Sequence, residues 1–304
     1  RRNSMENILE VQQVSKTFPR SDFALDNVSF ALPYGAVLGF VGENGAGKTT
    51  TIGCILNTVN RDSGTVKLFG REMSDGDTDM REKIGVVYDG NNFPVYWTPR
   101  QLSKIMGGLY KNWDAVLFEK YLDTFDLPAK QKIRHYSRGM TMKLAIAAAL
   151  SHHPQLLILD EATSGLDPVV RDDMLEVFLD FVQEEDHSIL LSSHITSDLE
   201  KIADYISFIH HGKIIMTVSK NDLSYHFAVM RCRESQFCAL DPEDIVAWRK
   251  RDLQIDVLVS DGRAAQRKYR DVVVDHVSIE EVMLLLCTRA HGGKSVNDTK
   301  GERV

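Results

Sequence analysis

A glycine-rich loop near the N-terminus constrains this chain more than any other feature. Residues 42–50 read Gly-Glu-Asn-Gly-Ala-Gly-Lys-Thr-Thr, which matches the phosphate-binding pattern G-x-x-x-x-G-K-[ST]. The apolar run at 36–41 has the length and character of a buried parallel strand, and residues 50–56 can continue as a helix. Because the motif requires this strand–loop–helix context, the sequence predicts a phosphate site rather than a glycine turn with a chance lysine.

Each residue type in the loop has a physical use in holding a phosphate chain. Glycines let backbone N–H groups turn toward phosphate oxygens without a Cβ clash, and the start of the following helix adds partial positive charge. We expect Lys48 to reach the β- and γ-phosphates, and Thr49 to hold Mg²⁺ through its hydroxyl. The predicted nucleotide-binding residues of the loop are Gly42, Asn44, Gly45, Gly47, Lys48, Thr49 and Thr50.

A second candidate segment ends in two acids. Residues 156–159 are four aliphatic side chains, and Asp160 and Glu161 follow them. Burying the aliphatic run places Asp160 at the carboxyl edge of a parallel sheet, where ligands bind in open α/β folds. Asp160 therefore suits Mg²⁺, directly or through water, and Glu161 is positioned as a base for an attacking water. Taken alone, the pair could equally be solvated acids at a strand end, but the upstream phosphate loop favours the catalytic interpretation.

Composition excludes several classes of protein. The chain has 304 residues, 43% hydrophobic and 26% charged, which is typical of a globular protein with a full core. The formal net charge of −7 argues against a nucleic-acid binder held by phosphate neutralisation. No apolar run approaches the roughly 18 residues that span a bilayer. The four cysteines lack C-x-x-C spacing, so we expect reduced thiols.

The order of expected elements predicts the fold class α/β. Parallel-type strands at 36–41, 84–88, 156–159 and 188–192 alternate with helices, as in a P-loop NTPase core. Short strands at 8–32 and 65–70 indicate an antiparallel β subdomain. Helices expected at 98–152, one of them capped by Thr98 with Pro99 behind it, form an inserted helical subdomain at about 91–152. A hairpin is expected at 206–218, and a small α+β extension follows.

A short segment before one of these helices carries a family resemblance. Residues 136–140 read Tyr-Ser-Arg-Gly-Met and precede an Ala-rich helix. A Ser-x-Gly at a helix start, between a phosphate loop and an apolar-Asp-Glu strand, resembles the signature of ATP-binding cassette ATPases. Residues 164–167 are similar to the D-loop of that family, and residues 192–194 to its switch-histidine segment. Phe18 stands where the family has an aromatic side chain that stacks on adenine. These motifs cover about residues 8–220 in family order.

The resemblance implies an ATPase that works as a dimer with Mg²⁺ as cofactor. Two copies would sandwich two ATP molecules head to tail, with Ser137 and Gly139 of one copy on the γ-phosphate held by the other. Exposed N–H groups at a helix start form an anion site, which supports this arrangement physically. His194 would touch the γ-phosphate and orient the attacking water together with Glu161.

Within the family, the chain most resembles the nucleotide-binding subunit of a bacterial exporter of the antibiotic- or peptide-efflux type. That resemblance implies a separate transmembrane permease, a second nucleotide-binding subunit that makes a homodimer, and a peripheral location on the cytoplasmic face of the cell membrane. A soluble cassette ATPase with a regulatory or assembly role is the alternative. The transported substrate belongs to the permease and is not encoded here.

Two residues depart from the family pattern. Asp89 follows the strand at 84–88, where many cassettes carry Gln, and it could still contact the metal or water. Arg138 replaces a small signature residue, and either contacts phosphate or is a surface arginine. Nearby, residues 91–97 concentrate aromatic side chains. They either form a groove for a coupling helix of the membrane subunit, as the resemblance implies, or pack the helical subdomain itself.

The remaining segments carry little chemistry in their sequence. We expect an ATPase domain at 5–220, an accessory segment at 221–290 that dimerises, regulates or only packs, and a flexible tail at 291–304. Ser278 and Glu281 predict a capping box before a terminal helix at 282–289. The doublets His152-His153 and His210-His211 are not expected to bind metal, because no acid or cysteine spacing completes a site.

Overall fold

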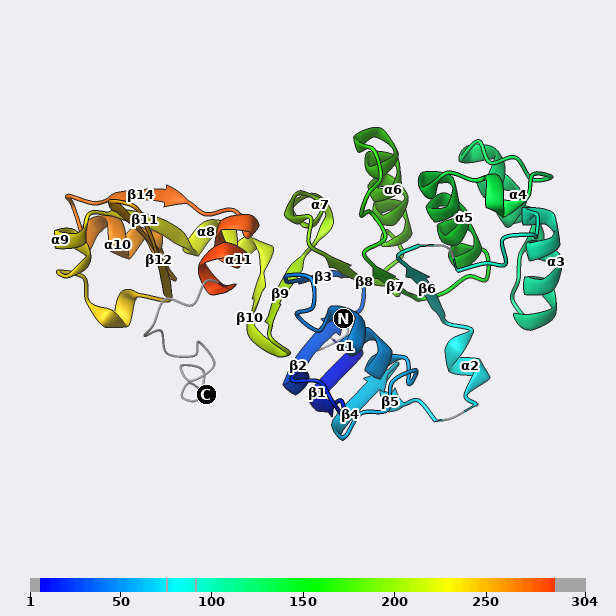
Figure 1. Cartoon of the computed structure of the whole chain (residues 1–304), viewed down its shortest axis with the longest axis horizontal. Helices are drawn as coiled ribbons and strands as arrows, with labels where there is room; N and C mark the ends of the chain where they lie inside the picture. Colours follow the sequence, from blue (N-terminus) through cyan, green and yellow to red (C-terminus); the bar gives the residue numbers. More distant parts are fainter. Residues whose placement is uncertain (1–5, 75, 91, 288–304) are drawn as a thin grey trace.

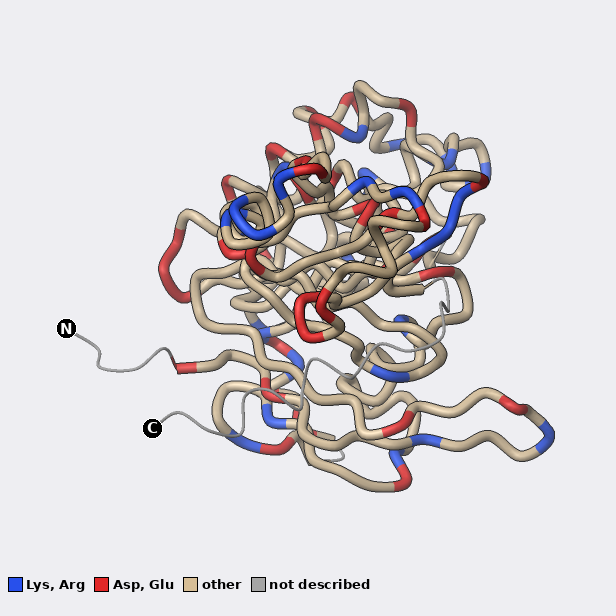
Figure 2. The backbone as a smooth tube through the Cα atoms, turned by 90° about the vertical axis from the view of Figure 1, so that its left-hand side faces the viewer, with Lys and Arg blue, Asp and Glu red and all other residues tan. Residues whose placement is uncertain are grey.

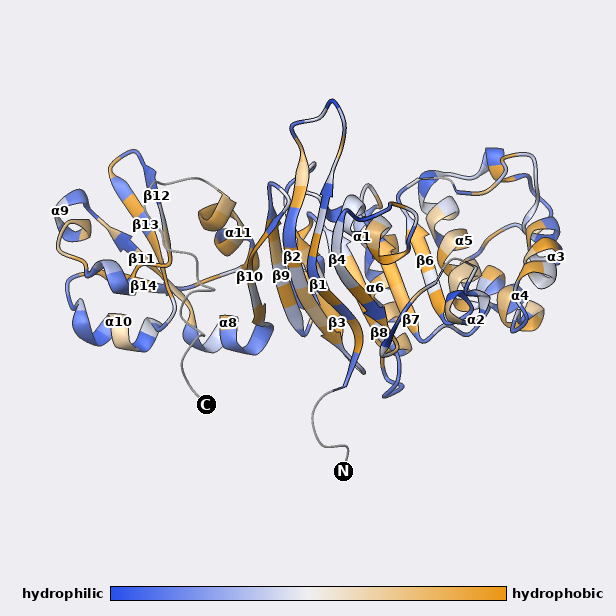
Figure 3. Cartoon of the chain, turned by 90° about the horizontal axis from the view of Figure 1, so that it is seen from below, coloured by the Kyte–Doolittle hydropathy of each residue, from blue (hydrophilic) through white to orange (hydrophobic). Residues whose placement is uncertain are grey.

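A six-stranded sheet lies at the centre of the computed structural model, which describes residues 6–74, 76–90 and 92–287 (Figure 1). In spatial order its strands are β10 (Lys213–Ser219), β9 (Tyr205–His210), β3 (Val37–Val41), β8 (Ser188–Ser193), β7 (Leu156–Asp160) and β6 (Ile84–Tyr88). All neighbours pair in parallel except β10, which pairs antiparallel with β9. Every residue of β3, β7 and β8 is buried, which explains the apolar runs at 37–41, 156–159 and 189–191 (Figure 3).

A second, antiparallel sheet packs near the phosphate loop. Its strands, in the order β2-β1-β4-β5, are β2 (Ala24–Pro33), β1 (Asn7–Thr17), β4 (Ser63–Leu68) and β5 (Arg71–Glu72). Their apolar residues share one core with α1 (Lys48–Ile55) and with Leu38, Phe40 and Leu190 of the central sheet. The phosphate loop between β3 and α1 is therefore supported from both sheets, and the predicted antiparallel β subdomain is present.

A short helix, α2 (Thr78–Arg81), comes before β6, and the inserted helical subdomain comes after it. It contains α3 (Pro99–Leu109), α4 (Ala115–Thr124), the 3-10 turn η1 (Ile133–His135) and α5 (Arg138–Leu150). Thr98 caps α3 with Gln101 in a capping box and with Pro99 at its first position, so the predicted helix start is confirmed. In Figure 1 these helices gather at the end of the central sheet that β6 forms.

Two further helices connect the last parallel strands. α6 (Pro168–Phe181) begins after Asp167, whose carboxylate caps the helix by accepting a hydrogen bond from the Val170 amide at 3.1 Å. α7 (Thr196–Ile202), which was not expected from the sequence, joins β8 to β9.

The C-terminal segment forms a third sheet of the order β12-β13-β11-β14. Its elements are α8 (Lys220–His226), β11 (Ala228–Cys232), α9 (Glu234–Phe237), η2 (Pro242–Asp244), β12 (Ala247–Arg251), β13 (Gln254–Val259), α10 (Gly262–Lys268), β14 (Val273–His276) and α11 (Ile279–Cys287). Strand β12 and helix α10 were not expected. The predicted capping box before α11 is confirmed, because the Glu281 amide donates to the Ser278 hydroxyl at 3.1 Å.

The C-terminal segment shares part of its core with the part of the chain that precedes it. Val229, Leu258 and Val282 belong to the same buried cluster as Leu199 and Phe208. Among the described residues, no helix is long and apolar enough to cross a membrane. Basic and acidic residues are interspersed along the backbone in the view of Figure 2. The expected tail at 291–304 lies outside the described residues, as does Asn91 of the aromatic loop.

Candidate nucleotide site

Three glycines give the phosphate loop its shape. Gly45 and Gly47 have φ of 82° and 115°, a region that side-chain-bearing residues rarely adopt. Gly47 is also the left-handed N-cap of α1. A Cβ on Gly42 would lie 2.3 Å from the carbonyl oxygen of Ile209, so only glycine lets the loop pack against β9. The glycines thus hold the loop curled at the start of α1, as the sequence predicted.

Lys48 lies inside this loop and is only 5% exposed. Its Nζ donates to the carbonyl oxygens of Gly42 and Glu43 at 2.7 and 3.2 Å, and lies 3.2 Å from Oε1 of Glu161. The ammonium group therefore sits between the loop and the end of β7. A buried charge held by carbonyl oxygens and one carboxylate is positioned for exchange with phosphate oxygens.

Thr49 and Asp160 meet at the carboxyl edge of the central sheet. The Thr49 hydroxyl donates to one carboxylate oxygen of Asp160 at 2.8 Å, and the Ser192 hydroxyl donates to the other at 2.6 Å. Ser192 comes from β8, beside β7, and its contact with Asp160 was not foreseen. A hydroxyl and a carboxylate are hard oxygen ligands, so Thr49 and Asp160, both predicted as Mg²⁺ ligands, fit that ion. The Asp89 carboxylate instead accepts a hydrogen bond from Arg138.

Glu161 links the phosphate loop to the switch segment. Its Oε2 lies 2.6 Å from Nδ1 of His194, while Oε1 faces the Lys48 ammonium. The residue has φ of 54°, an uncommon backbone conformation for a side chain larger than glycine. Such conformations persist where the surrounding structure determines them, often at functional sites. Glu161 and His194, 33 positions apart in sequence, are therefore brought into direct contact.

The pocket at the phosphate loop has a volume of about 340 Å³. Its lining residues are Phe23, Asn44, Gly45, Gly47, Lys48, Thr49, Thr50 and Glu161. Phe18, the expected adenine contact, is not among them, but its ring centroid lies 6.3 Å from that of Phe23. Phe23 was missed from the sequence because it stands in an irregular loop without periodicity.

A carboxylate holds the strand end that carries Phe18. Asp62 accepts hydrogen bonds from the backbone amide and the hydroxyl of Thr17, both at 2.7 Å, and from Lys16 at 2.9 Å. These bonds to the charged carboxylate, from Thr17 first and Lys16 next, lower the pKa of Asp62 to about 2. Asp62 thus fixes the start of the loop that carries both aromatic rings.

The signature residues lie away from the phosphate pocket of their own chain. Ser137 is exposed at the start of α5, where its hydroxyl accepts a hydrogen bond from the Met140 amide at 3.2 Å. Gly139 has no neighbour closer than 3.9 Å to the place where a Cβ would stand. Neither residue lines the pocket around Lys48, so the structure does not bring them together with the phosphate loop.

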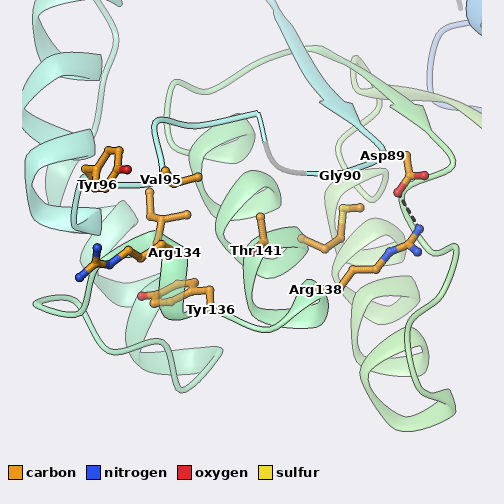
Figure 4. A pocket seen from close by; sticks show the side chains of 10 residues that line it. Asp89, Gly90, Val95, Tyr96, Arg134, Tyr136, Arg138 and Thr141 are labelled. Carbon is orange, nitrogen blue, oxygen red and sulfur yellow. Dashed lines mark hydrogen bonds and ion pairs between the residues drawn. The ribbon is translucent and has the colours of Figure 1, made fainter.

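A separate groove of about 590 Å³ lies between the end of β6 and the helical subdomain (Figure 4). Tyr96 lines it, is 67% exposed, and stacks near the guanidinium of Arg134, 5.8 Å from the ring centroid. Phe93 and Trp97 instead pack against the buried core. Both interpretations of the aromatic loop therefore hold for part of it: Phe93 and Trp97 pack the core, and Tyr96 is exposed.

Known proteins resemble this chain in sequence and in fold. Residues 25–164 match the family model described as ABC transporter. The bacitracin transport ATP-binding protein BcrA of Bacillus licheniformis is 33% identical over 217 residues, covering 69% of each chain. The lantibiotic transport ATP-binding protein SrtF of Streptococcus pyogenes is 34% identical, covering 69% of this chain and 90% of its own. A solved structure titled as the ATP binding subunit of an ABC transporter is 26% identical with a TM-score of 0.65, over 71% of this chain and 91% of that one. The phosphate loop, the acidic strand end and these relatives agree, so the chain belongs to the ABC transporter family, as an ATP-binding and ATP-hydrolysing subunit.

Proposed function

We propose that this subunit drives export of a peptide-type antibiotic through a separate permease, using ATP held at the Lys48 loop. One observation carries the catalytic part: the Glu161 carboxylate lies between the Lys48 ammonium and the His194 imidazole. Glu161 is the general base that takes a proton from the attacking water, and His194 orients that water. The contact with His194 fixes the position of the Glu161 carboxylate at the edge of the sheet.

The loop residues then bind and position the nucleotide. Lys48 exchanges the carbonyl oxygens of Gly42 and Glu43 for β- and γ-phosphate oxygens. Backbone N–H groups at Gly45 and Gly47 face the same phosphates. Mg²⁺, when bound by Thr49 and Asp160, supplies charge neutralisation at the phosphates. Phe23, with Phe18 behind it, provides the apolar surface for the base.

The signature residues require a second copy. Ser137 and Gly139 do not line the phosphate pocket of their own chain. At the start of α5 the Met140 amide donates to the Ser137 hydroxyl, and the amides of Arg138 and Gly139 have no acceptor within the helix. A partner subunit in head-to-tail orientation would present its γ-phosphate to that helix start. ATP then joins the two copies, and hydrolysis releases them. We propose a homodimer because one chain supplies both halves of the site.

The groove in Figure 4 is the proposed contact for the permease. It adjoins Asp89, at the end of the strand next to β7, so a bound helix would sense the nucleotide site. The exposed Tyr96 ring and the Arg134 guanidinium give it the aromatic and cationic character that protein interfaces favour. The chain would then lie peripherally on the cytoplasmic face of the membrane. The transport names of the relatives favour this function over the regulatory or assembly alternative.

Co-expression with a candidate permease tests the proposal. A tagged chain should retain the membrane protein through detergent purification and confer resistance to a bacitracin-type peptide. Tyr96→Asp should lose the membrane protein while the purified subunit keeps its ATPase activity. Tyr225→Asp, at another exposed tyrosine in α8, is the matched control and should behave like the unchanged chain. Equal retention by the Tyr96 variant would exclude this groove as the contact.

A further inference from the structure

Three side chains of different chemistry converge beside the phosphate loop. A carboxylate oxygen of Glu43, a ring nitrogen of His210 and the sulfur of Cys287 all lie within 4.8 Å of one another. Glu43 belongs to the phosphate loop, His210 ends β9, and Cys287 ends α11. The sequence did not predict a metal site at His210. Glu43 and Cys287, which lie beside it in the structure, are far from it in sequence, so no local spacing indicates the cluster.

Two sets of contacts in the fold bring these residues together. Strand β9 runs parallel to β3, and the phosphate loop closes against its end, where the Gly212 amide donates to the Ala46 carbonyl at 2.8 Å. Helix α11 packs against α7, and the Ile279 amide donates to the Glu200 carboxylate at 3.2 Å. Glu43 is exposed, whereas His210 and Cys287 are half-buried. The cluster therefore has two partly sheltered groups and one exposed carboxylate.

We propose that Glu43, His210 and Cys287 form a site for one divalent cation, for which Zn²⁺ is the best match. Zn²⁺ binds thiolate, imidazole and carboxylate together in tetrahedral sites. Mg²⁺ prefers oxygen ligands alone, so it favours the Thr49–Asp160 position instead. Three protein ligands leave one coordination position for water.

Only small movements are needed to close the site. Zn–ligand bonds of about 2.0–2.3 Å place tetrahedral ligand atoms roughly 3.5 Å apart. The present separations, up to 4.8 Å, therefore have to shrink by about an ångström. Burial, and then the neighbouring Glu43 carboxylate, raise the pKa of the Cys287 thiol to about 11, so a cation must displace the thiol proton on binding.

A cation at this position would fasten the end of α11 to the phosphate loop. Glu43 contributes its backbone carbonyl to Lys48 and its side chain to the cation site. Occupation would then restrain the loop segment that has to reorganise when Lys48 turns to phosphate. This gives the accessory segment a regulatory use that its sequence did not reveal.

Cobalt substitution tests the site without nucleotide and without any activity measurement. The metal-free full chain is titrated with Co²⁺ in excess Mg²⁺, and the thiolate-to-cobalt absorption band in the near ultraviolet is followed. We expect a band that saturates at one Co²⁺ per chain and disappears when Zn²⁺ is added. Cys287→Ala should abolish it. Cys238→Ala, at an exposed cysteine of the same segment, is the matched control and should leave it unchanged.

Zinc affinity, measured by competition with a chromophoric chelator, separates the ligands. Glu43→Gln and His210→Ala should each weaken Zn²⁺ binding by at least about 10-fold. Loss of a residue that only supports a metal ligand already costs about 10-fold in affinity, so loss of a ligand itself should cost no less. Amide hydrogen exchange over residues 279–287 should slow with Zn²⁺ in the unchanged chain but not in Cys287→Ala. A full-length chain that binds Zn²⁺ no tighter than Cys287→Ala, or whose cobalt band survives that substitution, would overturn the site.

Discussion

Nη2 of Arg138 donates a hydrogen bond to Oδ1 of Asp89 at 2.7 Å, so the two residues that depart from the family pattern contact each other (Figure 4). Asp89 follows the last strand of the central sheet, and Arg138 begins the signature helix. The Arg138 guanidinium also crowds Gly165, where a Cβ would lie 2.7 Å from it. The ion pair therefore joins the core to the helical subdomain beside the D-loop.

The Asp89–Arg138 ion pair should contribute little free energy to ATP-dependent dimerisation. Both side chains are about half exposed, at 50% and 49%, and solvent screens such pairs to at most about 1 kcal/mol. A double-mutant cycle with Asp89→Asn and Arg138→Gln, made in the Glu161→Gln background, tests this. The quantity compared is the ATP concentration at which half of the protein is dimeric, and we expect the two substitutions to be coupled by at most about fivefold in it. The coupling should shrink in high salt. Light scattering on the four proteins of the cycle measures it, and a salt-independent coupling above tenfold would contradict this account.

Glu161→Gln should lower ATP turnover by about 10²–10⁴-fold, the usual contribution of a general base. The amide keeps the size of the side chain but cannot accept the proton from water. ATP binding should survive, and the dimer with bound ATP should accumulate. Steady-state hydrolysis and nucleotide affinity measure the two effects. Glu176→Gln, on the exposed face of α6, is the control. Hydrolysis within a few-fold of normal would remove Glu161 from this role.

The sequence predicted local features better than contacts between distant segments. Strand β6 was expected at the residues where it occurs, and Thr98 and Ser278 cap their helices as predicted. Capping and glycine patterns are local, because their hydrogen bonds join residues only a few positions apart. Helix α7 and strand β12 were missed, since both are short and carry few periodic apolar residues.

The candidate site shows the same division. Lys48, Thr49, Asp160 and Glu161 converge because strand order places the ends of β3 and β7 at one edge, which the motifs implied. Phe23, and the pairing of Asp89 with Arg138, depend on loop conformations that no repeat or spacing records. The closeness of Cys287 to Glu43 of the phosphate loop depends on where the C-terminal segment packs, and tertiary packing alone decides that.

Asp62→Asn should weaken nucleotide binding through the loop that carries Phe18 and Phe23. The neutral amide has a single acceptor oxygen, so it cannot accept all three hydrogen bonds that Thr17 and Lys16 donate. We expect a loss of about 3–10-fold in ATP affinity, typical of one or two weakened hydrogen bonds. Isothermal titration with ATP measures it. Asp22→Asn, at an exposed carboxylate of the same loop, should leave the affinity unchanged.

The same residue predicts a dependence of stability on pH. The folded-state pKa of Asp62, about 2, lies below its ordinary value of 3.8, so its charged form is stabilised by folding. That stabilisation is fully present above the ordinary pKa and is lost as pH falls toward 2. The difference in melting temperature between the unchanged chain and Asp62→Asn should therefore be constant above about pH 5 and narrow below it. A gap that widens on acidification would refute the assignment.

Ser137→Arg tests the head-to-tail dimer. Ser137 does not line the phosphate pocket of its own chain, so the variant monomer should bind ATP with nearly normal affinity. The arginine side chain would fill the space meant for the γ-phosphate of the partner subunit and block ATP-dependent dimerisation and hydrolysis. Thr124→Arg adds the same side chain to an exposed position of α4 and is the matched control. It should dimerise like its parent.

The measurement is light scattering with ATP in the Glu161→Gln background, where the dimer accumulates. Mixing Ser137→Arg with Lys48→Ala, without the Glu161 change, adds a second comparison, because one mixed dimer holds a composite site with both halves intact. Hydrolysis should return in the mixture if each site can act alone, and strictly coupled sites would stay silent. The scattering result therefore decides between the models. If Ser137→Arg dimerises with ATP as well as its parent and Thr124→Arg do, the signature helix does not contact the phosphate of a partner subunit, and the head-to-tail arrangement is wrong for this chain.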